Sequence, residues 1–281
     1  MAHAFAAKAG ESGLIDGSAG ALRSLTRIKY SIRNATEDSE KEGEPPLKAE
    51  APGLAVPPVA VPGYLAQTYW WAYVHPRAVR VFERQWLVNL ILWGNFNKLR
   101  DAALAALGER LDGRTLQIAC VYGNLTRKLL ARVPLGAQLD VVDVLPVQLE
   151  NLARKLPPGA DVGLIQGDSA ALDIATGTYD RALLFFLLHE QPAEVRRRTL
   201  AEALRVVRPG GRLVIVDYHR PSLLNPLYWP MAGVLHTLEP FALDLWEREI
   251  AEWLPAGAAN SVPGKTLSFG GLYQLLTITR Q

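Results

Sequence analysis

The chain has 281 residues, of which 49% are hydrophobic and 21% are charged, so it can bury a sizeable core. Its formal net charge of +2 is near balance, so charge gives no argument for nucleic-acid binding. The single cysteine excludes an intrachain disulfide framework and a multi-thiolate zinc site. Because no run of about 18 consecutive apolar residues occurs, the sequence predicts no transmembrane helix.

Residues 1–62 have the composition of a disordered tail. Residues 37–44 are dense in charge, and prolines recur from Pro45 to Pro62. Such a segment buries too little apolar surface to offset the entropy of ordering it. The basic residues near the start are accompanied by Glu11 and Asp16, so an organelle transit peptide has weak support.

The next segment, residues 63–110, is rich in aromatic residues and predicts helical structure. Apolar residues recur at helical intervals from residue 78 to 107, with an interruption expected at Gly94 and Asn95. The aromatic residues either pack an N-terminal helix on the following domain or face a membrane or apolar ligand. The segment contains these candidates: Trp70, Trp71, Trp86, Trp93 and, as a substrate or metal group, His75.

From residue 111 to 281 strands and helices alternate. Strands are expected at 115–121, 138–144, 161–166, 179–187 and 212–218, and helices at 125–133, 146–156 and 192–207. This alternation around an apolar central strand predicts an α/β domain with a mostly parallel sheet covered on both faces. Two last strands, 265–269 and 273–280, form an expected antiparallel edge pair and bring the number of strands to seven. The aromatic insertion 221–263 is expected to lie over the carboxyl ends of the strands, where ligands bind.

Two acidic positions follow strands at that edge. Asp143 ends the second strand 20 residues after Gly123, a spacing at which a carboxylate accepts hydrogen bonds from ribose hydroxyls. Asp168, with Ser169, follows the third strand and can contact an adenine amino group. The structural alternatives are that Asp143 caps the helix opened by Pro146 and that the other two are turn residues.

Two histidines are candidates for the reaction centre. His189 follows the fourth strand, and His219 follows the fifth. Either could transfer a proton or bind a metal, and either could be a satisfied histidine at a strand end. Cys120 is expected to be a small core residue within the first strand.

Residues 111–280 resemble class I S-adenosylmethionine-dependent methyltransferases, which have a Rossmann-like fold, and especially their quinone C-methyltransferase group. The stretches that carry the resemblance are Leu139-Asp-Val-Val-Asp-Val-Leu-Pro, Gly167-Asp168, Tyr179-Asp-Arg-Ala-Leu-Leu-Phe-Phe-Leu-Leu-His-Glu and Arg208-Pro-Gly-Gly-Arg-Leu-Val-Ile-Val-Asp. The resemblance implies S-adenosylmethionine as the ligand of this edge.

The loop after the first strand departs from the family pattern of an acid and three spaced glycines. Gln117 stands at the acid, Ala119 and Val121 at the first two glycines, and only Gly123 is retained. Because glycine permits positive φ and close backbone approach, Val121 and Tyr122 are expected to reshape the methionine end of the pocket. Loss of the acid removes a carboxylate that helps to hold the methionine ammonium and to keep it protonated.

Residues 63–280 closely resemble the rhodoquinone biosynthesis family. The supporting runs are Val121-Tyr-Gly-Asn-Leu-Thr, Tyr69-Trp-Trp-Ala-Tyr-Val-His-Pro and Trp86-Leu-Val-Asn-Leu-Ile-Leu-Trp-Gly-Asn. The resemblance implies replacement of a ubiquinone ring methoxy by an amino group, with S-adenosylmethionine as amino donor and Mn²⁺ assisting through ligands that the sequence does not identify. It also implies work at a membrane surface, which we expect to be the cytoplasmic side of an inner membrane.

The expected site combines these residues. Cofactor-binding positions are Gln117, Val121, Tyr122, Gly123, Asn124, Asp143, Asp168 and Ser169, and candidate catalytic residues are His189, Tyr122 and His219. Two other functions remain open: a conventional C- or O-methyltransferase acting on a quinone or lipid, and a non-catalytic protein that retains the cofactor fold as a binding module.

Overall fold

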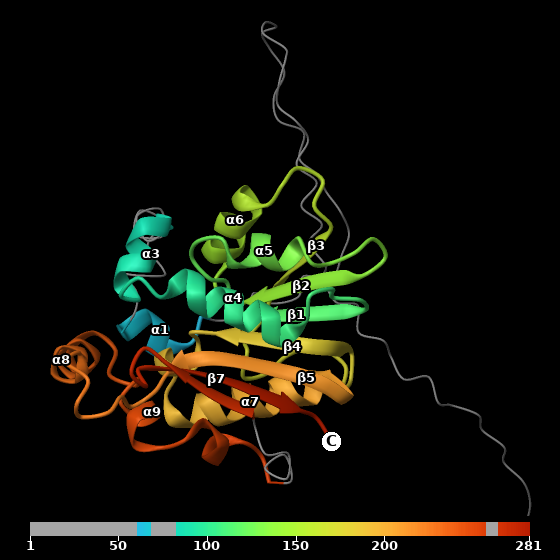
Figure 1. Cartoon of the computed structure of the whole chain (residues 1–281). Helices are drawn as coiled ribbons and strands as arrows, with labels where there is room; N and C mark the ends of the chain where they lie inside the picture. The colour runs from blue at the N-terminus through green and yellow to red at the C-terminus, as the bar shows by residue number, and fades with distance from the viewer. Residues whose placement is uncertain (1–60, 69–82, 257–263) are drawn as a thin grey trace, which may run out of the picture.

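The computed structural model describes residues 61–68, 83–256 and 264–281 (Figure 1). The predicted tail therefore lies outside the described residues, apart from Val61 and Pro62. Trp70, Trp71 and His75 also lie outside them.

The described residues form one seven-stranded sheet in the order β3-β2-β1-β4-β5-β7-β6. The pairs from β3 to β5 are parallel, and β7 runs antiparallel to both β5 and β6. The mostly parallel sheet and its antiparallel edge pair are thus confirmed. The strands are β1 (Arg114–Ile118), β2 (Gln138–Asp143), β3 (Val162–Gln166), β4 (Tyr179–Phe185), β5 (Val207–Tyr218), β6 (Gly264–Ser268) and β7 (Tyr273–Thr279).

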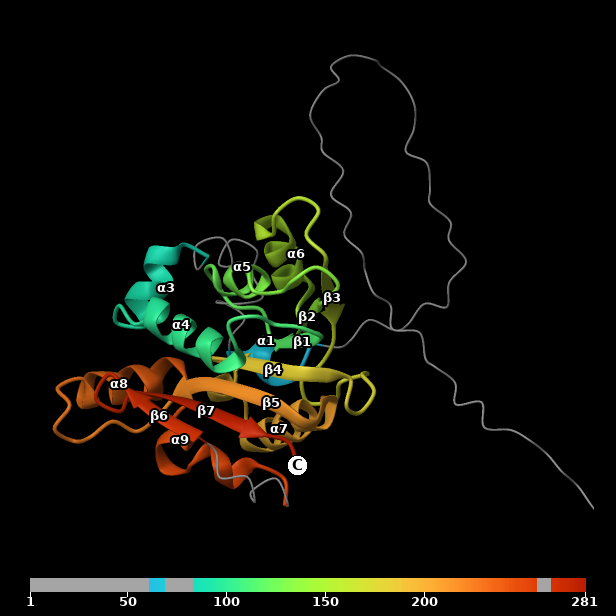
Figure 2. The ribbon, with the colours of Figure 1, turned by 45° about the vertical axis from the view of Figure 1, so that its right-hand side comes forward.

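Helices cover both faces of this sheet (Figures 1 and 2). Alternate strand residues point to opposite faces, so Phe185 packs with α4, α5 and α6, whereas Leu184 packs with α7. The helices are α1 (Gly63–Thr68), α3 (Gln85–Ile91), α4 (Phe96–Leu107), α5 (Leu125–Leu130), α6 (Pro146–Lys155), α7 (Ala193–Val206), α8 (Tyr228–Leu238) and α9 (Asp244–Glu247), with 3₁₀ turns η2 (Leu188–Glu190) and η3 (Ile250–Trp253). No helix among the described residues is long and apolar enough to cross a membrane.

The turn between α3 and α4 falls at the predicted interruption. Trp93 and Gly94 have φ values of 51° and 77°, in the left-handed region that ends a helix. The Asn95 side chain donates to the Trp93 carbonyl over 2.9 Å and stabilises the turn. The turn places α3 at the same end of the molecule as α8 (Figure 2).

The fifth strand differs from its predicted range of 212–218, because β5 already begins at Val207. Val207 pairs with Tyr179, and the register then shifts before Arg181 pairs with Arg212. The Pro-Gly-Gly sequence forms an irregularity inside the strand instead of a loop before it. Gly211 allows this close packing, because an added Cβ would lie 2.7 Å from the Asp180 carbonyl oxygen.

We expect Gly211→Ala to lower the free energy of unfolding by about 1–3 kcal/mol, since backbone atoms must move to admit the methyl group. Gly210 is the matched control: its φ is +73°, but nothing lies within 4 Å of an added Cβ. Gly210→Ala should therefore lower the free energy of unfolding by only about 1 kcal/mol, the cost of placing alanine in the left-handed conformation. Urea denaturation measures both, and an equal or smaller loss for Gly211→Ala would contradict the packing argument.

Candidate active site

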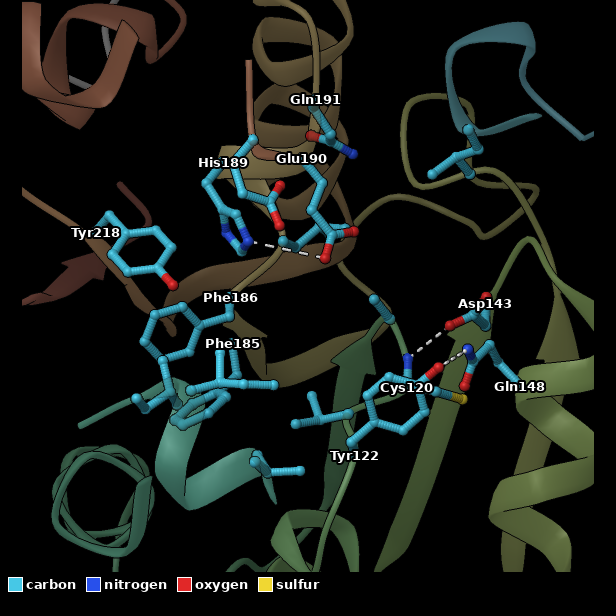
Figure 3. Close-up of a pocket in the computed structure, with 18 of the residues that line it drawn as sticks. Cys120, Tyr122, Asp143, Gln148, Phe185, Phe186, His189, Glu190, Gln191 and Tyr218 are labelled. Atoms are coloured by element: carbon cyan, nitrogen blue, oxygen red, sulfur yellow. Dashed lines mark hydrogen bonds and ion pairs between the residues drawn. The ribbon is translucent and has the colours of Figure 1, made fainter. Parts of the chain in front are cut away.

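A cavity of about 620 Å³ opens at the carboxyl ends of β1, β2 and β4, beneath α1, α3 and α8. Figure 3 shows two groups of side chains around it. Cys120, Tyr122, Asp143 and Gln148 lie on one side, and Phe186, His189, Glu190, Gln191 and Tyr218 lie on the other. The remaining wall is largely apolar, with side chains such as Val88, Leu92, Met231 and Leu235.

Asp143 lies at the end of β2 and lines the cavity. Its carboxylate accepts hydrogen bonds from the Cys120 amide over 2.7 Å and from the Leu145 amide over 2.8 Å. Leu145, and not Asp143, is the N-cap residue of α6. Burial raises the pKa of Asp143 to about 6, although these backbone hydrogen bonds oppose the shift. The carboxylate is therefore fixed in direction, and it loses its charge in mildly acidic solution.

Asp168 and Ser169 also line the cavity, after β3. Asp168 Oδ1 accepts from the Ala170 amide over 2.8 Å, which is the turn expected as the structural alternative. Ser169 Oγ lies 3.0 Å from Thr199 Oγ1 and accepts from Gln191 over 3.0 Å. Asp168 and Ser169 are therefore turn residues and also line the cavity, so the two alternatives do not exclude each other.

Gln117 is fully buried behind the loop and does not line the cavity. Its amide donates to the Ala119 carbonyl over 2.9 Å, and its oxygen accepts from the Thr126 hydroxyl over 2.9 Å. Gln117 therefore connects the loop at Ala119 to Thr126 of α5.

Cys120 was expected inside the first strand, and this is wrong. β1 ends at Ile118, because Ala119 has φ = 72° and breaks the extended backbone. Cys120 is half-buried in the loop and lines the cavity. Burial and the neighbouring Asp143 raise the pKa of its thiol, so the thiol stays protonated.

We expect Ala119→Gly to raise the free energy of unfolding by up to about 1 kcal/mol, since the left-handed conformation costs an L-residue about 1–2 kcal/mol and glycine loses part of that gain in chain entropy. Ala105→Gly, on the exposed face of α4, is the matched control and should lower stability by about 1 kcal/mol. Chemical denaturation compares the two, and an equal loss at Ala119 would show that its φ is not strained.

The remainder of the loop is held by an ion pair that the sequence analysis missed. Glu83 accepts from the Gly123 amide over 2.9 Å and pairs with Lys155 of α6 over 2.9 Å. Lys155 also donates to the carbonyls of Val121, over 3.3 Å, and Gly123, over 3.2 Å. No local signal joins these groups, because 72 residues separate Glu83 from Lys155.

The loop residues predicted to bind cofactor divide into two sets. Val121 and Tyr122 line the cavity, and the Tyr122 hydroxyl accepts from Gln148 over 2.9 Å. Gly123 and Asn124 lie outside the lining. Asn124 instead accepts from Arg100 of α4 over 2.7 Å, so it ties the loop to the N-terminal helices.

His189 forms the charged centre of the opposite side. Its Nδ1 lies 2.9 Å from Oδ1 of Asp217, whose side chain is fully buried and also accepts from the amides of Leu188 and Tyr218, each over 2.8 Å. Burial by itself would lower the pKa of His189, but Asp217, together with Glu239 and Glu190, raises it to about 9. An imidazolium therefore stands beside an apolar cavity at neutral pH.

Aromatic rings surround this imidazolium. The centroid of the Tyr218 ring lies 4.9 Å from that of His189, and the Phe186 centroid lies 5.9 Å from it, both edge to face. Phe186 has φ = 54°, a strained value for a bulky residue. A flat ring could be held against such a wall, with a polar atom directed at the histidine.

Asp217 is a second residue that the sequence analysis missed. It belongs to the Ile-Val-Asp run that ends β5, and β5 lies next to β4, which precedes His189. Because parallel strands end at one edge, an acid there was a detectable signal. His219, the second candidate after His189, lies elsewhere: it lines a second pocket, and its Nδ1 lies 2.8 Å from the Gly271 carbonyl oxygen.

The residues that the structure describes do not form a binding site for the expected Mn²⁺. No group of three or more His, Cys, Asp or Glu side chains among them could hold a metal ion. His189 is already paired with Asp217, and its other ring nitrogen lies 3.8 Å from Glu190. We therefore derive no chemical step through a metal.

Comparison with known proteins agrees with the fold. A family profile described as "Methyltransferase domain" matches residues 115–211. A demethylmenaquinone methyltransferase of Beutenbergia cavernae is 30% identical over 184 residues, which cover 62% of this chain and 73% of the relative. The demethylmenaquinone methyltransferase of Thermus thermophilus is 28% identical over 201 residues, covering 68% and 90%.

A solved structure gives the same fold. An O-methyltransferase family protein from Burkholderia thailandensis superposes with a TM-score of 0.55 at 19% identity, over 73% of this chain. The chain spans 60% of the length of that protein. At this identity the likeness concerns the fold alone.

The chain belongs to the class I S-adenosylmethionine-dependent methyltransferases. Within this class it is homologous to the quinone C-methyltransferases of ubiquinone and menaquinone biosynthesis, such as the enzyme named UbiE in Paracoccus denitrificans, which is 30% identical over 151 residues covering 52% of this chain and 58% of that relative. Membership implies S-adenosylmethionine as the co-substrate.

Proposed function

We propose that this protein is an S-adenosylmethionine-dependent transferase that acts on the ring of a lipid quinone. The observation that carries the proposal is that His189, paired with the buried Asp217, lines the same apolar cavity as Asp143 and Asp168. The names of the relatives support the substrate class. Work at the cytoplasmic face of an inner membrane is part of this proposal.

In this proposal the two sides of the cavity have different partners. The Asp143 carboxylate, oriented by two backbone amides, receives the ribose hydroxyls, and Asp168 lies on the adenine side. When bound, S-adenosylmethionine supplies the group that is transferred. Tyr122 and Val121 narrow the cavity between the two sides.

His189 has the role of an acid toward a ring oxygen. An imidazolium in an apolar, buried site donates a strong hydrogen bond and stabilises negative charge that develops on that oxygen. Asp217 fixes the ring orientation and keeps the proton on His189. Tyr218 and Phe186 hold the plane of the quinone. Attack by a nucleophile on a quinone ring places negative charge on a ring oxygen, which this acid stabilises. Methylation of a ring carbon instead starts from a quinol oxygen that has lost its proton, and the same imidazolium can hold that anion before the methyl group is transferred.

Methylation of a ring carbon is the reaction that the relatives favour. Replacement of a ring methoxy by an amino group, with S-adenosylmethionine as amino donor, is the second candidate. The observation that favours it is near the end of β1, where Gln117 stands at the position of the family acid and both ends of its side chain form hydrogen bonds within the protein. A carboxylate that would hold the methionine ammonium is therefore missing.

Product mass separates the two reactions. The full-length protein is incubated with S-adenosylmethionine and, in separate samples, with a demethylated quinol and with ubiquinone. Methylation adds a methyl group to the first, whereas amination exchanges methoxy for amino in the second. No change in either quinone would contradict the proposed function.

A further inference from the structure

A large uncharged surface surrounds the mouth of the cavity. Residues 85–97 and 221–238, which include α3 and α8, contain no Asp, Glu, Lys or Arg. Figures 1 and 2 place both helices at the same end of the molecule. The indole nitrogen of Trp93, which follows α3, lies 3.0 Å from the sulfur of Met231 in α8 and connects the two segments.

We define the apolar rim as the exposed large hydrophobic residues of these two segments: Trp86, Leu90, Ile91, Trp93, Leu223, Leu224, Trp229, Val234 and Leu238. Leu224 is 93% exposed, Trp229 74% and Trp86 61%. Exposed apolar patches of this kind mark interaction sites on water-soluble domains. Packing within the described chain thus leaves the apolar rim uncovered.

The rim is continuous with the interior of the cavity. Leu90, Ile91, Val234 and Leu238 are at once exposed to solvent and part of the cavity lining. An apolar path therefore leads from His189 to the outer surface without crossing a charged side chain of α3 or α8. Such a path fits a molecule with a polar ring and a long hydrocarbon tail that extends outward.

Charged residues stand only at the borders of the two segments. Arg84 and Lys98 flank the first segment, Arg220 precedes the second, and all three side chains are exposed. The acid at the border, Glu239, follows the second segment, is half-buried and lines the cavity. Tryptophans above an apolar face with basic residues at its edge are the composition that favours the interface of an anionic bilayer. A protein partner that used this surface would not require the continuity with the cavity.

We infer that the apolar rim seats the protein on the surface of an anionic phospholipid bilayer, with α3 and α8 at the depth of the headgroups and the cavity mouth open to the lipid. The inference rests on the proposed function, because a lipid quinone would then enter from the bilayer between these helices. The inference assigns the membrane contact to two segments, 85–97 and 221–238, which 123 residues separate in the sequence.

The test is flotation of the full-length protein with vesicles of phosphatidylcholine and phosphatidylglycerol. We expect the wild type to float, and the double variant Leu224→Glu/Trp229→Glu to bind at least about tenfold more weakly, because charge is placed where apolar surface must enter the interface. Leu135→Glu is the control: Leu135 is fully exposed but precedes β2, at the opposite edge of the sheet, and its variant should float like the wild type.

Turnover of a short-chain, water-soluble quinone is measured in parallel. Neither substituted residue of the double variant lines the cavity, so this turnover should be unchanged, while turnover of a long-chain quinone in vesicles should fall. A double variant that floats as well as the wild type overturns the inference. Wild-type protein that does not float overturns it too, together with the proposed work at a membrane face, while turnover of the soluble quinone leaves the proposed chemistry standing. A wild-type dimer that this variant dissociates, without vesicle binding, also overturns it, because the rim then joins two copies. Flotation without any quinone turnover supports the rim and contradicts the proposed function.

Discussion

His189→Asn is expected to reduce turnover of the quinone by about a hundredfold or more, the contribution that a positioned proton donor commonly makes. The asparagine amide nitrogen occupies nearly the place of Nδ1, so it can still donate to Asp217, whose buried carboxylate otherwise loses a partner. The variant should therefore fold and bind S-adenosylmethionine like the wild type, and the loss should appear in kcat.

The pH dependence gives this prediction a second readout. Since the pKa of His189 is about 9, the wild type should lose activity as the pH rises through that value, because the imidazolium gives up its proton. The Asn variant should lack this descending limb. His219→Asn provides the comparison, and it should cost far less because His219 lies in the second pocket. A similar loss at both positions, or an unchanged limb in the His189 variant, would contradict the assigned role.

Asp143→Asn is expected to weaken binding of S-adenosylmethionine by about ten- to a hundredfold, the value of a hydrogen bond to a charged acceptor at about 1.5–3 kcal/mol. The pKa of about 6 adds a pH dependence with a definite sign. Below that value the carboxyl is protonated and loses acceptor strength, so the wild-type affinity should fall by up to about tenfold per pH unit. Above it the affinity should be constant.

Calorimetric titration measures this affinity across the pH range. Asp161→Asn, an exposed position just before β3, is the matched control and should bind like the wild type at every pH. Because the amide of the Asp143 variant meets two backbone N–H groups, its thermal unfolding is recorded as well. A folded variant with wild-type affinity would contradict the ribose role. Wild-type protein that binds no S-adenosylmethionine would favour a non-catalytic binding protein.

The strands and their order could be predicted because apolar residues mark them directly. The range 179–187 is apolar from Ala182 onward and contains β4, at the centre of the sheet. The alternation of strands and helices required parallel neighbours for this strand. Two strand boundaries differ from the predicted ones because of the backbone conformation or packing at a single residue. Ala119 adopts a left-handed conformation and ends β1 early, whereas Gly211 allows β5 to start early.

The sequence predicted a site residue only where that residue lies at the carboxyl end of a predicted strand. Asp143, Asp168 and His189 line the cavity because each follows a parallel strand that ends at the same edge. The contacts that hold them could not be read locally. Glu83 reaches Gly123 across 40 residues, and Gln117 turns its side chain inward to Thr126, which no spacing rule reveals.

The measurement that tests the central claim most directly is a crystal structure of the full-length protein with S-adenosylhomocysteine and a short-chain quinone. We predict that both occupy the one cavity, with the ribose hydroxyls within hydrogen-bond distance of the Asp143 carboxylate and a ring oxygen within hydrogen-bond distance of His189 Nε2. A quinone ring bound away from His189, or an adenosyl group outside this cavity, would contradict it.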